Sequence, residues 1–518
     1  MPSFSMTEVP DVLTAHAAAR PDKPALICGE DVLTYRAYDE RSNRAARALI
    51  DLGVAPGDRV AVMSYNSIAG SVVSAGLGKA RAVSVPVNFR LRGSELAYVV
   101  QDSGARVVCA GPEFVEHVEA ARPLIETAPA LVAAGDVTPP AGWVRFGDAM
   151  ARLSGEPLPD AGEAGAGAGA AMIYTSGTTG HPKGAYRPNG IDPMAVLQTI
   201  HLFGLRGDDV HLMAGPSYHS AVASFAGLTM LCGATLVIMP RFDAEQALAL
   251  TARHGVTTTF MAPTLLQRIM DLPDETRAKY DVSSMRAIIL GAAPCPYSLK
   301  ERATAYFGEV LWEFYGATET GFNLVLRPED QLRKPGSAGT PPEGQEILLL
   351  DDGGNPVPDG QPGEVWVRNG VLAAYYNKPE ATARSMRDGF FSVGDVAYRD
   401  ADGYYYICDR KIDMIISGGV NIYPAEIEAC LHAHPAVGDV AVIGVPDDQW
   451  GESVKAVVAL QPGAAASEQE LIDWCRGRIA DYKRPRSVDF VVELPREAGK
   501  LLKRQIRAPY WASTGRSI

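Results

Sequence analysis

The sequence predicts an α/β fold, with a large N-terminal domain of two helix-covered β-sheets, a small β-barrel-like subdomain and a small α+β C-terminal domain. Three observations predict this organisation. The chain has 518 residues, more than one hydrophobic core usually organises. Apolar strand patterns alternate with helical patterns through the first part of the chain, which is typical of parallel sheets covered by helices. From about residue 334, frequent glycines separate short β-rich runs.

The expected elements of the first part follow in chain order. Residues 38–52 form an amphipathic helical pattern that ends at Gly53. Residues 162–170 are a low-complexity glycine and alanine run, which predicts an exposed connector. Apolar runs predict strands at 59–63, 105–110, 171–174, 235–239, 257–261, 287–290 and 310–314.

The sequence pattern of the second part of the chain differs from that of the first. Residues 346–350 and 364–368 read as strands of a small antiparallel sheet or barrel. We place a domain boundary near Arg410, which gives domains 1–410 and 411–518, with residues 334–410 as the β-rich subdomain. In the second domain, Pro424 is expected to open a helix. Ser467 and Glu470 form a capping box for another helix, and its apolar face is Leu471, Ile472, Cys475 and Ile479.

Composition excludes several classes of function. The hydrophobic fraction of 47% is ordinary, and the net charge of −13 argues against nucleic acid as a partner. No apolar run approaches the roughly 20 residues of a membrane span, so we expect no integral membrane association. The first residues lack the regions of a signal peptide. Seven scattered cysteines without C-x-x-C spacing fit a cytoplasmic protein rather than a disulfide or zinc framework.

A loop rich in hydroxyl groups follows the strand expected at 171–174. Thr175–Gly180 holds four hydroxyl side chains and two glycines, so its hydroxyls and backbone N–H groups can face an anion, and Lys183 adds a positive charge. The loop is not a Walker A motif, because Pro182 and Gly184 stand where that motif needs Gly and Ser or Thr. A P-loop NTPase is therefore disfavoured.

Three further loops carry unusual chemistry, and two of them directly follow predicted strands. In open α/β sheets, ligands bind beyond the carboxyl ends of the strands, so we expect these loops to share one cleft. The loops are residues 216–219, 291–294 and 315–319.

The ten residues Thr175–Gly184 match the signature of the adenylate-forming superfamily at every position. This superfamily includes acyl-CoA synthetases, luciferases and the adenylation domains of peptide synthetases. A flexible linker is the alternative interpretation, but a linker has no need of the Pro-Lys-Gly ending. The resemblance spans roughly residues 10 to 508, and it implies that the C-terminal domain is mobile.

The resemblance implies a site for ATP and Mg²⁺. Tyr315 would pack on adenine, Thr318 would lie near the α-phosphate, and Glu319 with Thr178 would hold the metal. Asp395, within a Ser-Val-Gly-Asp segment, would bind the ribose. The full set implied for ATP or AMP is Thr175, Ser176, Gly177, Thr178, Thr179, Lys183, Gly291, Ala292, Ala293, Pro294, Tyr315, Gly316, Thr318, Asp395 and Arg410.

The resemblance also implies sites for the acid and for CoA. His219 would act at the carboxylate substrate, although a lone histidine is as readily structural. The predicted acyl pocket is Tyr218, His219, Phe225, Gly316 and Gly321. The residues implied for CoA are Gly418, Gly419, Trp450, Tyr482, Arg484, Arg486 and Arg90. The Lys-Arg-Pro-Arg run that holds Arg484 and Arg486 is, however, more often a solvated surface.

The C-terminal segment matches the superfamily's terminal motif, and one hinge position departs from it. Lys500 corresponds to the lysine that grips the α-phosphate and carboxylate during adenylation. Together with Thr178, Glu319 and His219 it completes the implied catalytic set. The hinge position after Arg410 is normally polar, but here it is Ile412, which puts the usual hinge in doubt.

We therefore expect an ATP-dependent carboxylate–CoA ligase that uses ATP, Mg²⁺ and CoA. The pocket walls are mostly small or apolar and lack an evident amine-binding Asp, which favours a fatty, aromatic or alicyclic acid over an amino acid. A homodimer is possible. One alternative is a stand-alone enzyme that loads a carrier protein or performs one half-reaction. Another is a non-catalytic nucleotide-binding regulator, which the presence of Lys500 and Glu319 counts against.

Overall fold

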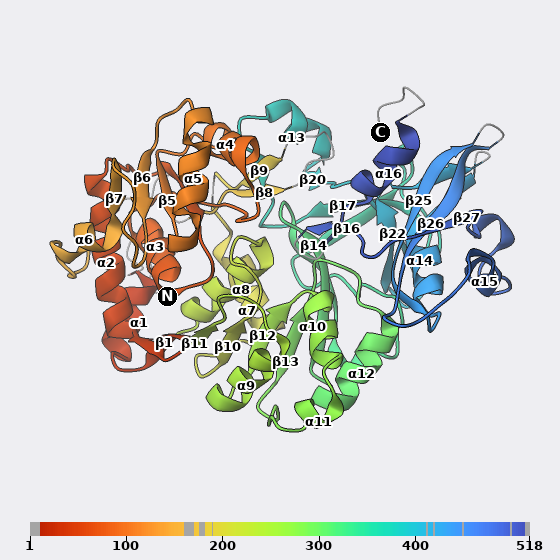
Figure 1. The fold of residues 1–518 in the computed structure, drawn as a ribbon, viewed down its shortest axis with the longest axis horizontal. Coiled ribbons are helices and arrows are strands. Elements are labelled where there is room, and N and C mark those ends of the chain that lie inside the picture. Colours follow the sequence, from red (N-terminus) through yellow and green to blue (C-terminus); the bar gives the residue numbers. More distant parts are fainter. Residues whose placement is uncertain are drawn as a thin grey trace, which may run out of the picture.

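In the computed structural model, the chain forms a large N-terminal body and a smaller C-terminal one (Figure 1). The structure describes residues 11–159, 170–175, 182–188, 190–410, 413–417, 420–447, 450–497 and 500–512, with the backbone alone at 409, 410, 421, 497 and 500. The connector expected at 162–170, apart from its last residue, lies outside these ranges. Among the described residues, none of the helices has the length and apolar character needed to span a membrane.

The first sheet has five parallel strands in the order β4-β3-β5-β6-β7. Alternate residues of its strands enter two different cores, since successive side chains point to opposite faces. Val60 packs with α2 and α3, whereas its neighbour Ala61 packs with α4 and α5. The elements are α2 (Tyr35–Asp51), β3 (Arg59–Met63), α3 (Ile68–Lys79), β4 (Val83–Pro86), α4 (Gly93–Asp102), β5 (Val107–Ala110), α5 (Val115–Ala121), β6 (Ala130–Ala133), β7 (Trp143–Arg145) and α6 (Phe146–Ala151).

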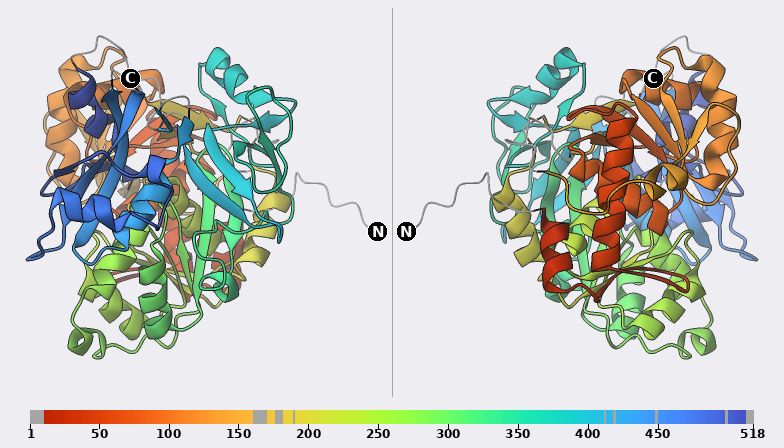
Figure 2. Two further views of the ribbon diagram at one scale, coloured as in Figure 1. Left: turned by 90° about the vertical axis from the view of Figure 1, so that its right-hand side faces the viewer. Right: turned by 90° about the vertical axis from the view of Figure 1, so that its left-hand side faces the viewer.

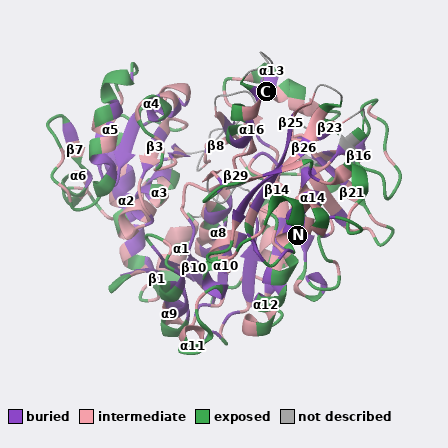
Figure 3. Cartoon of the chain, turned by 45° about the vertical axis from the view of Figure 1, so that its right-hand side comes forward, coloured by how far each residue is buried: buried purple, intermediate pink, exposed green. Residues whose placement is uncertain are grey.

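The second sheet has eight strands in the order β15-β14-β13-β12-β10-β11-β1-β2. Its central strands are parallel and mostly buried, while a hairpin closes each edge. The strands are β1 (Pro24–Cys28), β2 (Asp31–Thr34), β10 (Val210–Met213), β11 (Thr235–Ile238), β12 (Thr258–Met261), β13 (Ala287–Leu290), β14 (Leu311–Ala317) and β15 (Gly321–Leu326). The helices around it are α1 (Val12–Ala19), α7 (Pro193–Leu202), α8 (Ser220–Leu231), α9 (Ala244–His254), α10 (Pro263–Met270), α11 (Asp274–Arg277) and α12 (Tyr297–Phe307). Figure 3 shows the strands of both large sheets mainly as buried and the outer helices with exposed surface.

Two small sheets follow. One joins distant segments in the order β18-β9-β8, and its strands are β8 (Ile173–Thr175), β9 (Lys183–Tyr186) and β18 (Ala374–Tyr375). The other is antiparallel, as expected, with the strand order β19-β20-β17-β21-β22 and with β16 also paired to β17. Its elements are β16 (Glu346–Leu350), β17 (Gly363–Arg368), α13 (Pro379–Ser385), β19 (Met386–Arg387), β20 (Phe390–Phe391), β21 (Asp395–Arg399) and β22 (Tyr405–Arg410).

The C-terminal part has cores of its own, on the two faces of the long β25–β26 hairpin. Figures 1 and 2 both place it beside the small antiparallel sheet, and α14 packs on β22. Its elements are β23 (Ile415–Ser417), β24 (Val420–Ile422), α14 (Pro424–His432), β25 (Val437–Asp447), β26 (Gly451–Leu460), α15 (Glu468–Trp474), β27 (Ser487–Phe490), β28 (Arg496–Glu497), β29 (Lys500–Leu501) and α16 (Lys503–Trp511). The boundary near Arg410 stays a prediction, and the hinge position Ile412 lies outside the described residues.

Several expected boundaries were wrong. The strand expected at 171–174 is β8, which begins at Ile173 and is only half buried. The strand expected at 105–110 begins at Val107, because the N–H of Ala105 instead closes the turn after α4 by donating to the Val100 carbonyl. The Ser467 side chain caps α15 by accepting from the Glu470 N–H, but this helix ends at Trp474. Ile479 therefore packs on the same core from outside the helix.

Candidate active site

The carboxylate of Glu319 lies where the predicted phosphate loop, which begins at Thr175, meets the motif at 315–319. It follows β14 and is 6% exposed. Its Oε1 accepts a hydrogen bond from Thr175 Oγ1 at 3.1 Å and another from Tyr375 Oη at 3.1 Å. Thr175 ends β8, so the structure brings the start of the predicted phosphate loop to the predicted metal ligand. Tyr375, from β18, was not among the predicted residues.

Arg187 is a second residue that the sequence analysis missed. It follows β9, and its guanidinium donates to the carbonyl oxygens of Thr318 at 2.7 Å and Val371 at 2.5 Å. Burial lowers the pKa of Arg187, while nearby Glu319 acts in the opposite direction. The guanidinium therefore brings a half-buried positive charge to the backbone of the predicted metal-binding segment.

Lys183 lies on the same small sheet as Thr175 and Tyr375. Its Nζ lies 4.9 Å from the centroid of the Tyr375 ring, a cation–π arrangement that leaves the charge near Glu319's hydrogen-bond partner. Four of the predicted loop residues lie outside the described ranges, so their phosphate contacts stay predictions. They are Ser176, Gly177, Thr178 and Thr179.

Tyr315 and Asp395, predicted from separate motifs, are in direct contact. The Tyr315 hydroxyl donates to Asp395 Oδ2 at 2.6 Å. Asp395 is the first residue of β21 and pairs with Arg410 of β22. The residue predicted for adenine, Tyr315, therefore lies beside the residues predicted for ribose. Ser392 shapes the turn before Asp395, because its Oγ accepts from the Gly394 N–H at 3.0 Å and donates to a glutamate.

The predicted loop of Gly291, Ala292, Ala293 and Pro294 follows β13, as expected. Ala292 has a φ of 72°, a left-handed conformation that is unusual for alanine. A Cβ on Gly291 would lie 2.7 Å from the Phe314 ring, so the chain passes tightly over that ring. Beyond the loop, the Cys295 N–H donates to Glu313 Oε1 at 3.3 Å.

The strand expected to end at Phe314 continues to Ala317, so Tyr315 and Gly316 are strand residues rather than loop residues. The reason is the partner strand β15, which pairs with them. A Cβ on Gly316 would lie 1.9 Å from the carbonyl oxygen of Gly321. The glycine is thus required by the hairpin itself, not only by a ligand. Gly321 has a φ of 70° and packs against Val371.

The predicted acyl-pocket residues divide into two groups. His219 precedes α8, and its ring stacks on that of Phe260 with centroids 6.4 Å apart. The Tyr218 ring contacts Phe89 edge-on at 5.1 Å. Phe225, in contrast, has no exposed surface and packs inside the core against Phe260. In this structure its side chain therefore does not line a pocket.

The residues predicted for CoA are mostly on the surface. Trp450 and Tyr482 are 44% and 50% exposed. Arg484 pairs with Asp481 at 3.0 Å, which favours the surface interpretation of this arginine. Arg90 and Arg486 are exposed, and Gly418 and Gly419 lie outside the described ranges. Among the described residues, no hydrogen bond, ion pair or ring contact was found that joins Arg90 to these C-terminal residues.

The hairpin that carries Lys500 is anchored by an ion pair. Glu497 on β28 stands opposite Lys500 on β29. Arg496, at the start of the hairpin, donates through one guanidinium nitrogen to both oxygens of Asp439 on β25, at 2.7 and 2.9 Å. The hairpin is thereby fixed to the body of the C-terminal domain.

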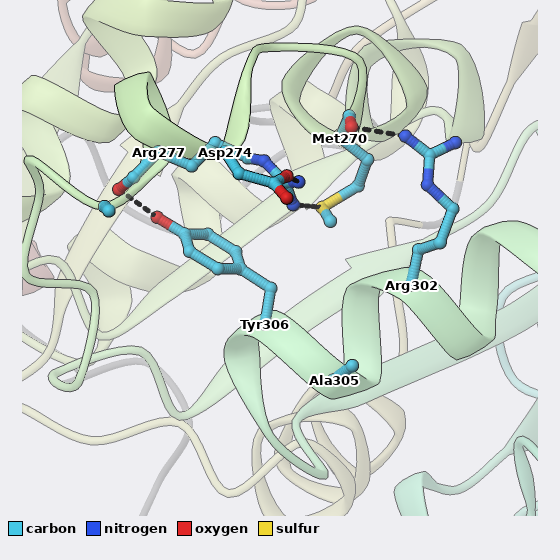
Figure 4. A pocket seen from close by; sticks show the side chains of 7 residues that line it. Met270, Asp274, Arg277, Arg302, Ala305 and Tyr306 are labelled. Carbon is cyan, nitrogen blue, oxygen red and sulfur yellow. Dashed lines mark hydrogen bonds and ion pairs between the residues drawn. The ribbon is translucent and has the colours of Figure 1, made fainter.

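A hollow of about 390 Å³ lies away from these residues, between α10, α11 and α12 (Figure 4). Its polar groups contact each other, since the Tyr306 hydroxyl donates to the Arg277 carbonyl at 2.9 Å and Arg302 donates to the Met270 carbonyl. None of the predicted site residues lines it. The lining is Met270, Asp274, Arg277, Ala278, Arg302, Ala305 and Tyr306.

Two helix-covered sheets, a motif-bearing hairpin and a separate C-terminal domain define the adenylate-forming class of enzymes. Residues 13–376 match the family described as AMP-binding enzyme, and residues 426–500 match the AMP-binding enzyme C-terminal domain. The chain belongs to the AMP-binding enzyme family.

Similar proteins cover nearly the whole chain. A feruloyl-CoA synthase from Amycolatopsis sp is 39% identical over 497 residues, which cover 95% of this chain and 96% of that protein. The fatty acid–[acyl-carrier-protein] ligase ScoC from Streptomyces coeruleorubidus is 33% identical over 518 residues, covering 97% and 96%. The crystal structure of the anthranilate CoA ligase AuaEII in complex with anthranoyl-AMP gives a TM-score of 0.89 at 28% identity, covering 99% of this chain and 100% of that one.

Proposed function

We propose that this enzyme activates an aromatic carboxylic acid with ATP and transfers the acyl group to CoA. The observation that carries the proposal is the contact of Glu319 with Thr175 and Tyr375, which joins the phosphate-loop motif to the Tyr-Gly-Ala-Thr-Glu motif. The full-length similarity to a feruloyl-CoA synthase supports it.

The reaction has two steps. A carboxylate oxygen of the acid attacks the α-phosphorus of ATP, and pyrophosphate leaves, which gives an acyl adenylate. The CoA sulfur then attacks the acyl carbon, and AMP leaves with the bonding electrons. The first step needs positioned groups that offset the negative charge of the phosphates. Lys183 provides positive charge beside the predicted loop, Arg187 provides it beside the backbone of Thr318, and Lys500 is assigned the α-phosphate.

Glu319 suits a role in holding Mg²⁺. Its buried carboxylate supplies the hard oxygen donors that this ion prefers, and Mg²⁺ commonly takes one or two carboxylates together with substrate phosphates. Among the described residues no group of three or more His, Cys, Asp or Glu side chains could form a metal cage. We assign the metal to Glu319 and Thr178, where it would neutralise phosphate charge.

An aromatic acid fits the side chains near His219. The rings of His219 and Phe260 stack, and the ring of Tyr218 meets that of Phe89, so two residues of the predicted acid site belong to aromatic pairs. The similarity to a feruloyl-CoA synthase and to an anthranilate CoA ligase agrees with this choice. Fatty and alicyclic acids are the alternatives to include in a test.

The test is a panel of carboxylic acids with ATP and Mg²⁺, scored by acid-dependent release of pyrophosphate. Aryl and aryl-propenoic acids should give the highest kcat/KM. A second stage adds CoA or an acyl-carrier protein to the best acid, because the similarity to ScoC makes a carrier protein the alternative acceptor. Absence of acid-dependent pyrophosphate release with every acid would refute the proposal, and transfer to the carrier protein alone would correct the acceptor.

We further propose that the enzyme is a cytoplasmic homodimer. All seven cysteines are free thiols, which suits a reducing compartment. Ile191, Met194 and Leu197 expose apolar side chains on and beside α7, and such a surface would suit contact with a second copy. Sedimentation velocity would distinguish a dimer from a monomer.

A further inference from the structure

Asp102 is a carboxylate in an electrostatically unfavourable place. It is the last residue of α4, where the partial negative charge of the helix C-terminus disfavours an anion. Its side chain is only 16% exposed, so water does little to offset this cost. A carboxylate kept there needs compensating contacts from other elements.

Three side chains provide these contacts. Tyr174 Oη donates to Asp102 Oδ2 at 2.8 Å, and Lys378 Nζ donates to Oδ1 at 2.7 Å. Tyr98, one turn earlier on α4, places its Oη 3.2 Å from Asp102 Oδ1 and 3.1 Å from the carbonyl oxygen of Pro182. Burial raises the pKa of both tyrosines, which keeps their hydroxyls available as donors.

The network around Asp102 reaches all three strands of the small sheet β18-β9-β8, since Asp102 contacts β8 through Tyr174, the residue before β9 through Tyr98, and the segment after β18 through Lys378. Tyr174 lies in β8, Pro182 directly precedes β9, and Lys378 follows shortly after β18. In the β8–β9 pair, Thr175 stands opposite Lys183, and each is the immediate neighbour of a residue in this network. Any displacement of these anchored positions therefore moves Thr175 and Lys183 within the candidate active site.

We propose that Asp102 is a positioning residue for ATP, which holds the two strands flanking residues 176–181 at the spacing that nucleotide binding requires. The proposal rests on the proposed function, because ATP activation is the step that these strands serve. Asp102 is too far along the chain from the motifs to be found by sequence spacing, and only the fold brings it to them. Its action is on the first half-reaction alone.

The test is Asp102→Asn, which keeps the shape of the side chain and removes its charge. Charged hydrogen bonds of this kind are worth about 10- to 100-fold in an equilibrium. We expect the KM for ATP to rise and acid-dependent pyrophosphate release to fall within that range. Conversion of preformed acyl adenylate and CoA to acyl-CoA should stay within about twofold of wild type. Tyr174→Phe should shift the same two quantities in the same direction, by less.

The matched control is Asp400→Asn. Asp400 also accepts from a lysine, Lys334 at 2.9 Å, and from a tyrosine, Tyr406 at 3.2 Å, but it lies in the turn between β21 and β22 of the small antiparallel sheet. This variant should leave the KM for ATP unchanged. An unchanged KM for ATP in Asp102→Asn, or an equal loss in both half-reactions, would overturn the proposal. Failure of the wild-type enzyme to release pyrophosphate would instead refute the proposed function.

Discussion

At the residue scale, the hydroxyl of Tyr375 offers a direct probe of how Glu319 is oriented. Tyr375→Phe removes the hydrogen bond to Glu319 Oε1 but keeps the ring beneath Lys183. We expect acid-dependent pyrophosphate release to fall by about tenfold, in line with one lost hydrogen bond to a charged group. Glu319→Ala should cost more, about 10²- to 10³-fold. A loss in Tyr375→Phe as large as that in Glu319→Ala would contradict the positioning role.

A second prediction concerns pH. Burial lowers the pKa of His211 to about 4, and its Nδ1 lies 2.9 Å from Thr258 Oγ1 in the core. The unfolded chain, with a pKa of about 6.5, binds more protons between these two values, so stability is lost as the pH falls through this window. At pH 5 the loss attributable to His211 is about 2 kcal/mol.

The measurement compares the melting temperatures of wild type and His211→Asn at pH 7 and pH 5. Asparagine places a neutral amide near the position of Nδ1, so the variant should lose less stability on acidification. An equal decrease in both proteins would show that other groups, such as half-buried His432, whose pKa burial also lowers, dominate acid unfolding.

The residues predicted from sequence were those whose motifs are contiguous. Thr175 and Glu319 each lie in a short segment with a recognisable pattern, and the structure brings them together. Arg187 and Tyr375 were missed because their hydrogen-bond partners lie between 56 and 184 positions away along the chain. The available signal for Arg187 was a charge after an apolar strand, and the signal for Tyr375 was a pair of adjacent tyrosines. Neither pattern specifies which residue the side chain contacts.

At the scale of elements, the β14–β15 hairpin has no room for a side chain at Gly316. A Cβ there would lie 1.9 Å from a backbone oxygen, which cannot move aside as a flexible side chain can. Gly316→Ala should cost about 3 kcal/mol or more. Gly78→Ala is the control, because its Cβ would meet nothing within 4 Å in helix α3, and it should be neutral or stabilising by up to about 1 kcal/mol. Urea unfolding midpoints that are equal for the two variants would contradict this account.

The strands were predictable where the amino-acid pattern of a single segment is enough to indicate a strand. The bounds of β3, β13 and β16 agree with the expected ranges, since each is a short apolar run. The end of β14 was not predictable in this way. Tyr315 and Gly316 look like the start of a loop by composition, and they become strand because β15 supplies hydrogen-bond partners. That information lies in the pairing and not in either segment alone.

At the scale of the whole molecule, Lys500 should separate the two half-reactions. The hairpin that carries it is held to the C-terminal domain by Arg496 and Asp439. If Lys500 neutralises the transferring phosphate, Lys500→Ala should slow acyl adenylate formation by at least about 10²-fold. Conversion of preformed acyl adenylate to acyl-CoA should continue at nearly the wild-type rate.

Rapid-quench measurements of each half-reaction test this expectation. An equal loss in both, in a variant with a wild-type melting temperature, would contradict a role for Lys500 in the first half-reaction alone. No loss in either would make Lys500 an ordinary surface lysine.

The second sheet also has a consequence for how the chain is made. Its strand β1 pairs with β11, with Leu26 opposite Leu236. At about 5–20 residues per second on the ribosome, Leu26 waits roughly 10–40 s for this partner to be synthesised. The first sheet, whose strands all lie between residues 59 and 145, can close during that wait. Strands β1 and β2 thus emerge before the first sheet but are placed only after it can close, and in that interval they are a part of the nascent chain that is open to chaperones.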